Sequence, residues 1–214
     1  MMIRFQLLHL LYFVVILNLG CANHYEAQFR TLETWKEIQE QNVVMQKFDF
    51  SCGTGSLATL MKYYFGDNVT ETMLIKDILD SLSETAVADR QEKGLSLFDL
   101  KCLSERKGYQ AYAVVLKPSA LYKIDRPILV YLETDKIKHF AVFRGIREDR
   151  VFLADPSQGN IRMSVRKFLK KWNKGIALVL DKKGFEPATN HPLSINTFFR
   201  PELTTARNSL FFKP

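Results

Sequence analysis

The segment Gln46–Tyr64, QKFDFSCGTGSLATLMKYY, decides how this sequence folds. Its first part is polar and extended, and it runs into a Cys-Gly pair at Cys52 and Gly53. Apolar residues then recur at intervals of three and four, as on one face of a helix: Leu57, Leu60, Met61 and Tyr64. Gly66 stands where a glycine commonly ends a helix. The pattern predicts a buried helix over 54–64 with Cys52 at its N-terminus.

Further helices and then strands are expected along the chain. Thr70–Leu82 carries a one-sided apolar stripe, and Ser96 with Asp99 forms a capping-box pattern that begins another helix. The polar segment Glu84–Gly94 is interpreted as a loop. Short runs rich in Val, Ile and aromatic residues predict strands over 109–116, 128–132, 139–146, 151–154 and 176–180. Helices followed by strands favour an α+β fold with the helices packed on one side of an antiparallel sheet.

Composition bounds the number of domains and the kind of partner. With 214 residues, 47% of them apolar, the chain can bury one sizeable core. We expect one domain over 43–183, a helical arm over 23–42 and an extended or partly disordered tail over 184–214. The net charge is +7, but basic residues alternate with acidic residues along most of the chain. This pattern is typical of a solvated surface and not of a nucleic-acid binder. The densest basic stretch, Arg166–Lys174, has apolar residues at helical spacing and predicts an amphipathic helix on the core.

The N-terminal stretch 1–22 resembles an export signal, because Arg4 precedes an apolar run that ends in small residues. The run is short for a membrane span. Cleavage after Ala22 and lipidation of Cys21 both fit, and an uncleaved anchor is a third possibility. We therefore expect an exported protein, either periplasmic or attached to a membrane through its N-terminus.

Export bears on the role of the cysteines. If Cys21 is removed or lipidated, Cys52 and Cys102 remain, and one pair makes no disulfide scaffold. Cys102 lies in the middle of a predicted helix beside Leu100 and Leu103, and we expect it in the core. Cys52 lies at a helix N-terminus, where unpaired N–H groups stabilise a thiolate. Its position indicates a nucleophile.

Three other residues could complete such a site. His139 begins a predicted strand, and Asp155 ends the next one before a proline. Taken singly, His139 would be an edge histidine and Asp155 a turn aspartate. Adjacent antiparallel strands place them side by side, so that the carboxylate could accept the imidazole N–H and orient the ring. Gln46 could donate to an oxyanion together with the Cys52 backbone N–H. The set points to acyl transfer, and no pattern calls for a cofactor or a metal ion.

These motifs resemble those of the peptidase C39 family, the bacteriocin-processing or double-glycine peptidases. The resemblance covers about 43–182 and rests on QKFDFSCGTGSL at 46–57, HFAV at 139–142 and DPSQG at 155–159. It implies a papain-like fold. It also implies a triad of Cys52, His139 and Asp155, with Gln46 in the oxyanion hole.

This sequence departs from the family pattern in two places near the cysteine. Ser51 stands where the family usually has Asp, and Gly55 where Ala is common. The best-known members of the family are N-terminal domains of ABC exporters. This sequence has an export signal and no ATP-binding glycine-rich loop, so we expect a stand-alone exported member, and the family's substrate is not carried over to it.

Three functions fit these observations. The first is a cysteine endopeptidase that cleaves a peptide or secreted protein. The second is a papain-like amidase that cuts peptidoglycan, and the third is a catalytically silent module that binds peptides or assists assembly. The presence of both Cys52 and His139 favours an active peptidase.

Overall fold

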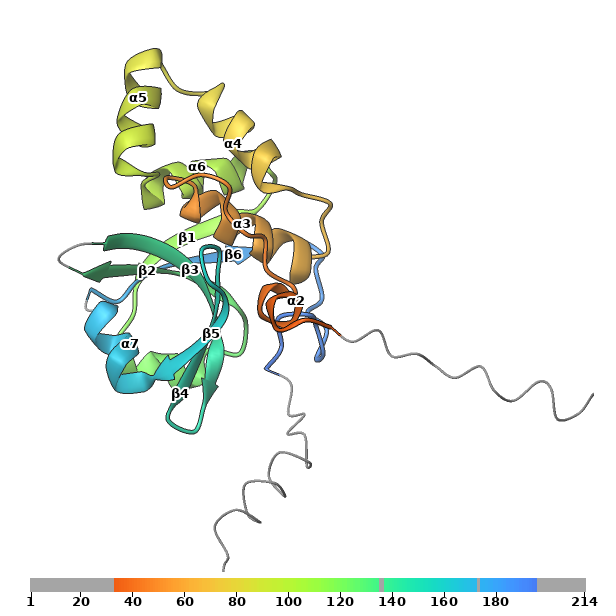
Figure 1. The fold of residues 1–214 in the computed structure, drawn as a ribbon. Helices are drawn as coiled ribbons and strands as arrows, with labels where there is room; N and C mark the ends of the chain where they lie inside the picture. The colour runs from red at the N-terminus through yellow and green to blue at the C-terminus, as the bar shows by residue number, and fades with distance from the viewer. Residues whose placement is uncertain (1–32, 135–136, 173, 196–214) are drawn as a thin grey trace, which may run out of the picture. The chain divides into compact units, whose positions relative to one another are not determined.

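The structure is a computed structural model that describes residues 33–134, 137–172 and 174–195. The chain divides into residues 1–34 and a second unit that begins at Trp35, and the domain lies in the second unit. The predicted export signal and the first half of the predicted arm, residues 23–32, lie outside the described residues. In chain order the elements are α2 (Trp35–Glu40), α3 (Cys52–Tyr63), α4 (Glu71–Leu79), α5 (Glu84–Lys93), α6 (Leu97–Arg106), β1 (Gln110–Val115), η1 (Pro118–Lys123), β2 (Ile128–Thr134), β3 (Ile137–Arg147), β4 (Arg150–Asp155), β5 (Gly159–Ser164), α7 (Val165–Lys171) and β6 (Ile176–Asp181) (Figure 1).

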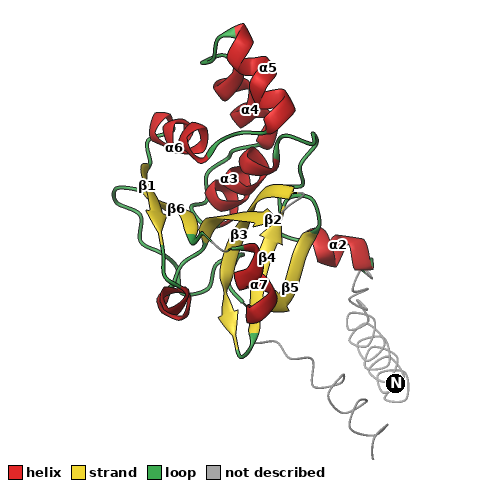
Figure 2. Cartoon of the chain, turned by 90° about the vertical axis from the view of Figure 1, so that its left-hand side faces the viewer, coloured by secondary structure: helices red, strands yellow, loops and turns green. Residues whose placement is uncertain are grey.

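The strands form one antiparallel sheet in the order β1-β6-β2-β3-β4-β5. In both overall views, helices α3 to α6 lie together on one side of the sheet and α7 lies apart from them (Figures 1 and 2). The α+β fold with helices on an antiparallel sheet is therefore confirmed. No helix in the described part of the chain combines the length and apolar character needed to cross a bilayer.

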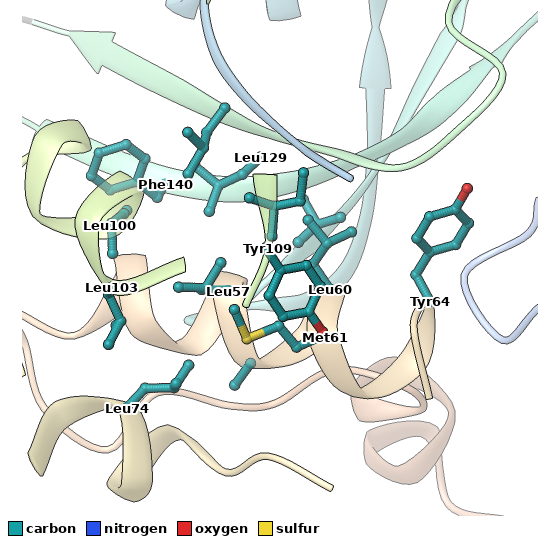
Figure 3. Close-up of a cluster of buried hydrophobic side chains, with 14 of the residues drawn as sticks. Leu57, Leu60, Met61, Tyr64, Leu74, Leu100, Leu103, Tyr109, Leu129 and Phe140 are labelled. Atoms are coloured by element: carbon teal, nitrogen blue, oxygen red, sulfur yellow. The ribbon is translucent and has the colours of Figure 1, made fainter. Parts of the chain in front are cut away.

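The first hydrophobic core lies between the sheet and helix α3. Leu57, Leu60 and Met61 are fully buried there, together with residues of α4, α6, β2 and β3 (Figure 3). Burial of each such side chain contributes about 1.5–3 kcal/mol. The apolar stripe after Cys52 thus anchors the helix that begins with that cysteine.

A second core lies on the opposite face of the sheet, under α7. Phe168 and Trp172 pack there with Phe143 of β3, and the Trp172 indole N–H donates to the Ile176 carbonyl at 2.8 Å. Ser164 caps the helix by accepting from the Lys167 backbone N–H. The predicted basic amphipathic helix is confirmed, with its apolar side on this core.

The prediction of a loop over Glu84–Gly94 is wrong, because this segment forms α5. Ser83 caps the helix by accepting from the Ala86 N–H, and Gly94 ends it with φ 80°. Helix α5 buries none of its residues, so it carries no apolar stripe that would identify it in the sequence. Arg90 instead ties it to α6 through an ion pair with Asp99, at 2.6 Å between Nε and Oδ2.

Strand β5 was not among the predicted strands. Its sequence, GNIRMS, has only Ile161 and Met163 as apolar residues, and it forms one edge of the sheet. Short polar strands are common at sheet edges, where they discourage pairing with other chains. Strand β3 also begins earlier than expected, at Ile137, so His139 lies within the strand.

The described part of the tail, residues 184–195, has no regular helix or strand, yet it packs on the domain. Leu193 is fully buried in the first core. Arg144 holds this segment by donating from Nε to the Leu193 carbonyl at 2.9 Å and from Nη2 to the Ser194 carbonyl at 2.8 Å. The rest of the predicted tail, residues 196–214, lies outside the described residues.

Candidate active site

Cys52 is the first residue of α3, and only 8% of it is exposed. The first backbone N–H groups of a helix have no partner within the helix and carry the positive end of its dipole. The sulfur therefore lies beside a local positive potential at the rim of the first core. This is the placement expected from the sequence.

His139 and Asp155 come from adjacent strands and contact each other directly. The distance between His139 Nε2 and Asp155 Oδ1 is 3.0 Å. The Cys52 side chain also interacts with the ring and raises its pKa, so the two side chains are neighbours. Because Asp155 occupies Nε2, Nδ1 is the ring nitrogen left for the sulfur. Cys52, His139 and Asp155 thus lie at one site.

Asp155 is almost completely buried, with 2% of the side chain exposed. Its Oδ1 accepts from the backbone N–H of Ser157 at 2.8 Å, from the Ser157 hydroxyl at 2.7 Å and from the backbone N–H of Gln158 at 3.2 Å. Burial alone would raise the pKa of this carboxyl, but the hydrogen bonds from His139 and Ser157 outweigh it and lower the pKa. Asp155 is therefore held as a carboxylate.

The pKa of the His139 ring is shifted upward. Burial alone would lower its pKa, but the hydrogen bonds and charges of Asp155 and Cys52 outweigh burial and raise the pKa to about 9. An imidazolium is thus favoured beside the Asp155 carboxylate. A neighbouring imidazolium is one of the groups that activate a cysteine nucleophile.

Contacts near Pro156 bring the sheet up against α3. A Cβ at Gly55 would lie 2.8 Å from the Pro156 Cβ, so only glycine lets the turn after Asp155 approach the helix this closely. The Gln46 backbone N–H donates to the Pro156 carbonyl at 2.7 Å. The buried Ser56 hydroxyl donates to the Phe140 carbonyl at 3.0 Å, next to His139. These contacts align the two halves of the site.

Gln46 lies beside this turn, but its amide is partly engaged. Nε2 donates to the Phe48 carbonyl at 2.9 Å, and the buried Oε1 has no hydrogen-bond partner among the described residues. A carboxamide nitrogen carries two hydrogens, so one donor remains for another acceptor. Within the described ranges, no three His, Cys, Asp or Glu side chains gather as metal ligands would.

A family model for peptidase C39 matches residues 40–184. The chain belongs to the peptidase C39 family. Membership makes it a cysteine peptidase and confirms the resemblance of its motifs. A probable functional amyloid protease, FapD of Pseudomonas fluorescens, is 33% identical to it over 160 residues, which cover 75% of this chain and 69% of FapD.

Solved structures of the same family share the fold of this C39 chain. The peptidase domain of Streptococcus ComA, a bifunctional ABC transporter, superposes with a TM-score of 0.55 at 19% identity, over 67% of this chain and 99% of that domain. A double-glycine-motif protease from an AMS/PCAT transporter, in complex with the leader peptide, gives 0.55 at 20% identity, over 68% and 94%. These likenesses show the papain-like C39 fold.

Glu71 supports the site of this C39 domain, a role that no sequence pattern predicted. It begins α4 and is 2% exposed. Its two carboxylate oxygens accept from the Lys47 backbone N–H at 3.1 and 3.2 Å, and Oε1 accepts from the Ser51 hydroxyl at 2.5 Å. It thus holds both ends of the loop between Gln46 and Cys52. A single acid at a helix start is no signal in sequence, because its partners come from another segment.

Two cavities in this C39 domain are lined by Cys52, His139 or Asp155. One, the Cys52 cavity, has a volume of about 350 Å³ and is lined by Cys52 and by Leu95, Leu97, Tyr131 and Phe140 among others. The second, the His139 cavity, has a volume of about 110 Å³ and is lined by both His139 and Asp155. Cys52 thus lines the first cavity and His139 the second.

Cys102 differs from its expected place in the core. Its side chain is partly exposed, and it is a free thiol, as Cys52 is. The neighbouring Leu100 and Leu103 are fully buried on the core side of α6. The helical turn thus carries Cys102 round to the edge of that face.

Proposed function

We propose that Cys52, His139 and Asp155 are the catalytic triad of an endopeptidase that cleaves an exported peptide or protein. The observation that carries this proposal is the His139 ring, which contacts Asp155 at 3.0 Å through Nε2 and has its pKa raised by the neighbouring Cys52 side chain. A nucleophile, a base and a group that orients the base are the parts that acyl transfer requires.

In the first half of the reaction, the Cys52 sulfur attacks the carbonyl carbon of the scissile peptide bond. The oxyanion that forms is stabilised by the Cys52 backbone N–H and by the free amide hydrogen of Gln46. The C–N bond then breaks as His139 transfers a proton to the leaving amine, which leaves a thioester on Cys52. Asp155 keeps the ring oriented throughout.

In the second half, water attacks the thioester and His139 accepts one of its protons. The C–S bond breaks, the acid product leaves, and the proton on His139 remains to pair with the Cys52 thiolate. No other reagent is required. The cycle ends in the charge state with which it began.

We propose an exported protein as substrate, on two grounds. Residues 1–22 resemble an export signal, with either Cys21 lipidated or the segment removed after Ala22. The relative in Pseudomonas fluorescens is a probable functional amyloid protease. We infer that this chain works outside the cytoplasm, periplasmic or lipid-anchored, on a component of a secreted amyloid.

The test uses the full chain with its own N-terminus. Wild type, Cys52→Ala and the matched control Cys102→Ala are expressed in cells that lack the wild-type copy, and fragments of co-secreted proteins are identified by mass spectrometry. Proteolysis should vanish in Cys52→Ala and persist in Cys102→Ala. Muropeptide release from purified cell wall would instead favour the amidase. A full biological phenotype in Cys52→Ala would show a silent binding module and refute the proposal.

A further inference from the structure

The two cavities are lined by different members of the Cys52–His139 pair. The carbonyl carbon must reach the Cys52 sulfur, whereas the leaving nitrogen must reach the His139 ring that protonates it. Cys52 lines the Cys52 cavity and His139 does not. His139 lines the His139 cavity and Cys52 does not. The acyl part of a substrate therefore extends toward the first cavity and the amine part toward the second.

The His139 cavity is formed between the strands that carry His139 and Asp155 and their neighbours. Besides those two residues its walls are Leu132, Ser157, Gln158, Ile161, Met163 and Lys171. Leu132 and Met163 are buried members of the second core, so this wall is fixed by packing. Ser157 and Gln158 are fixed by their hydrogen bonds to Asp155. The cavity is thus preformed, with apolar walls at Leu132, Ile161 and Met163 and polar or charged residues around the rest.

We propose that the His139 cavity binds the side chain of the residue that follows the scissile bond, and that it selects an aliphatic side chain. The inference rests on the proposed peptidase function and adds a specificity site to it. Leu132, Ile161 and Met163 supply the apolar contact.

The size of the cavity sets an upper limit on that side chain. An apolar cavity of about 150 Å³ holds a benzene molecule. At about 110 Å³ the His139 cavity suits a branched aliphatic side chain and is too small for an indole. It is also well below the usual size of a small-molecule pocket, roughly 300–1,000 Å³. A single side chain is the ligand that fits.

The experiment measures how an acyl-enzyme divides between water and added amines. Benzyloxycarbonyl-glycine p-nitrophenyl ester is an activated acyl donor that needs no specific recognition. Cys52 forms the thioester and releases p-nitrophenolate as a burst. An amino-acid amide bound in the His139 cavity then attacks the thioester, so that a C–N bond forms and the C–S bond breaks. His139 takes the proton from the amine, and liquid chromatography with mass spectrometry counts the acid and amide products.

Glycinamide, leucinamide and tryptophanamide have similarly nucleophilic amines, so differences in product report binding of the side chain. Leucinamide should capture the acyl group roughly 10-fold more efficiently than glycinamide, the usual scale for a buried aliphatic group. Tryptophanamide should capture no more than glycinamide. Ile161→Trp should abolish the preference for leucinamide, and Ile161→Ala should admit tryptophanamide. Arg162→Trp adds the same bulk at the exposed neighbouring position and should keep the wild-type order.

Two different failures can be told apart. Absence of a burst that depends on Cys52 would refute the peptidase proposal, and this inference with it. A normal burst with equal capture of all three amides would refute the inference alone. The same conclusion would follow if Arg162→Trp erased the preference as fully as Ile161→Trp.

Discussion

At the scale of single residues, His139 experiences two opposing influences on its pKa. Burial disfavours the imidazolium, while Asp155 and Cys52 favour it and raise the pKa from 6.5 to about 9. A raised pKa means that the folded state binds the proton more tightly than the unfolded state does. This contribution to stability is complete below about pH 6.5 and is lost as the pH rises through about 9.

The pH dependence of kcat/KM tests the role of Asp155. Activity of wild type should fall on the alkaline side with a midpoint near pH 9, because His139 then loses its proton. Asp155→Asn removes the charge that raises the pKa, so the alkaline midpoint should move to lower pH. The maximal rate should also fall, by roughly 100- to 10,000-fold. An unchanged alkaline midpoint in Asp155→Asn would show that Asp155 does not control the ring.

Gln46→Ala tests the oxyanion donor. The variant loses the one amide hydrogen that is free of Phe48, so kcat should fall roughly 10- to 1,000-fold while the protein stays folded. Lys47→Ala removes an exposed neighbouring side chain and should stay within about 2-fold of wild type. Equal effects of the two substitutions on kcat would argue against a specific role for Gln46.

At the scale of elements, α4 supports the loop that leads into α3. Glu71→Ala leaves the Lys47 N–H and the buried Ser51 hydroxyl without their acceptor, which should cost about 1–3 kcal/mol of unfolding free energy. The loop also carries Gln46, so kcat should fall. Urea unfolding and steady-state kinetics measure the two effects. Lys76→Ala, on the exposed side of the same helix, is the control. If Glu71→Ala had the same unfolding free energy and kcat as this control, α4 would not support the loop.

The segment after β6 is expected to act as part of the domain. Leu193 is fully buried in the first core, so Leu193→Ala should lower the unfolding free energy by about 2–5 kcal/mol. Thr189→Ala, at an exposed position in the same segment, should change it by less than about 0.5 kcal/mol. Equal stability of the two variants in urea would mean that this segment does not contribute to the folded core.

How far each element could be predicted depends on whether its signal is local. Helix α3 was predicted because its buried residues recur in the sequence at intervals of three and four. The pairing of His139 with Asp155 was predicted because the two residues lie on consecutive strands. Helix α5 carries no such stripe, and β5 has too few apolar residues to mark a strand. The roles of Glu71 and Leu193 depend on contacts with distant segments. Such contacts have no periodic signal in the chain.

At the scale of the whole domain, the site lies where the helices pack on the sheet. Cys52 belongs to the helices on the first core, whereas His139 and Asp155 belong to the sheet. The Ser56–Phe140 hydrogen bond and the contact of Gly55 with Pro156 fix one part against the other. Reactivity at Cys52 is therefore a property of the intact domain, and unfolding should abolish it.

The most direct test of the triad compares two thiols in one molecule. The native protein is treated with iodoacetamide near pH 7, and the modified fraction of Cys52 and of Cys102 is followed by peptide mapping. Cys52 is the more buried thiol, so exposure alone would favour Cys102. The triad predicts the reverse order, with Cys52 faster on the order of 10-fold or more, and loss of that advantage in His139→Ala. Faster labelling of Cys102, or no change in His139→Ala, would contradict the account.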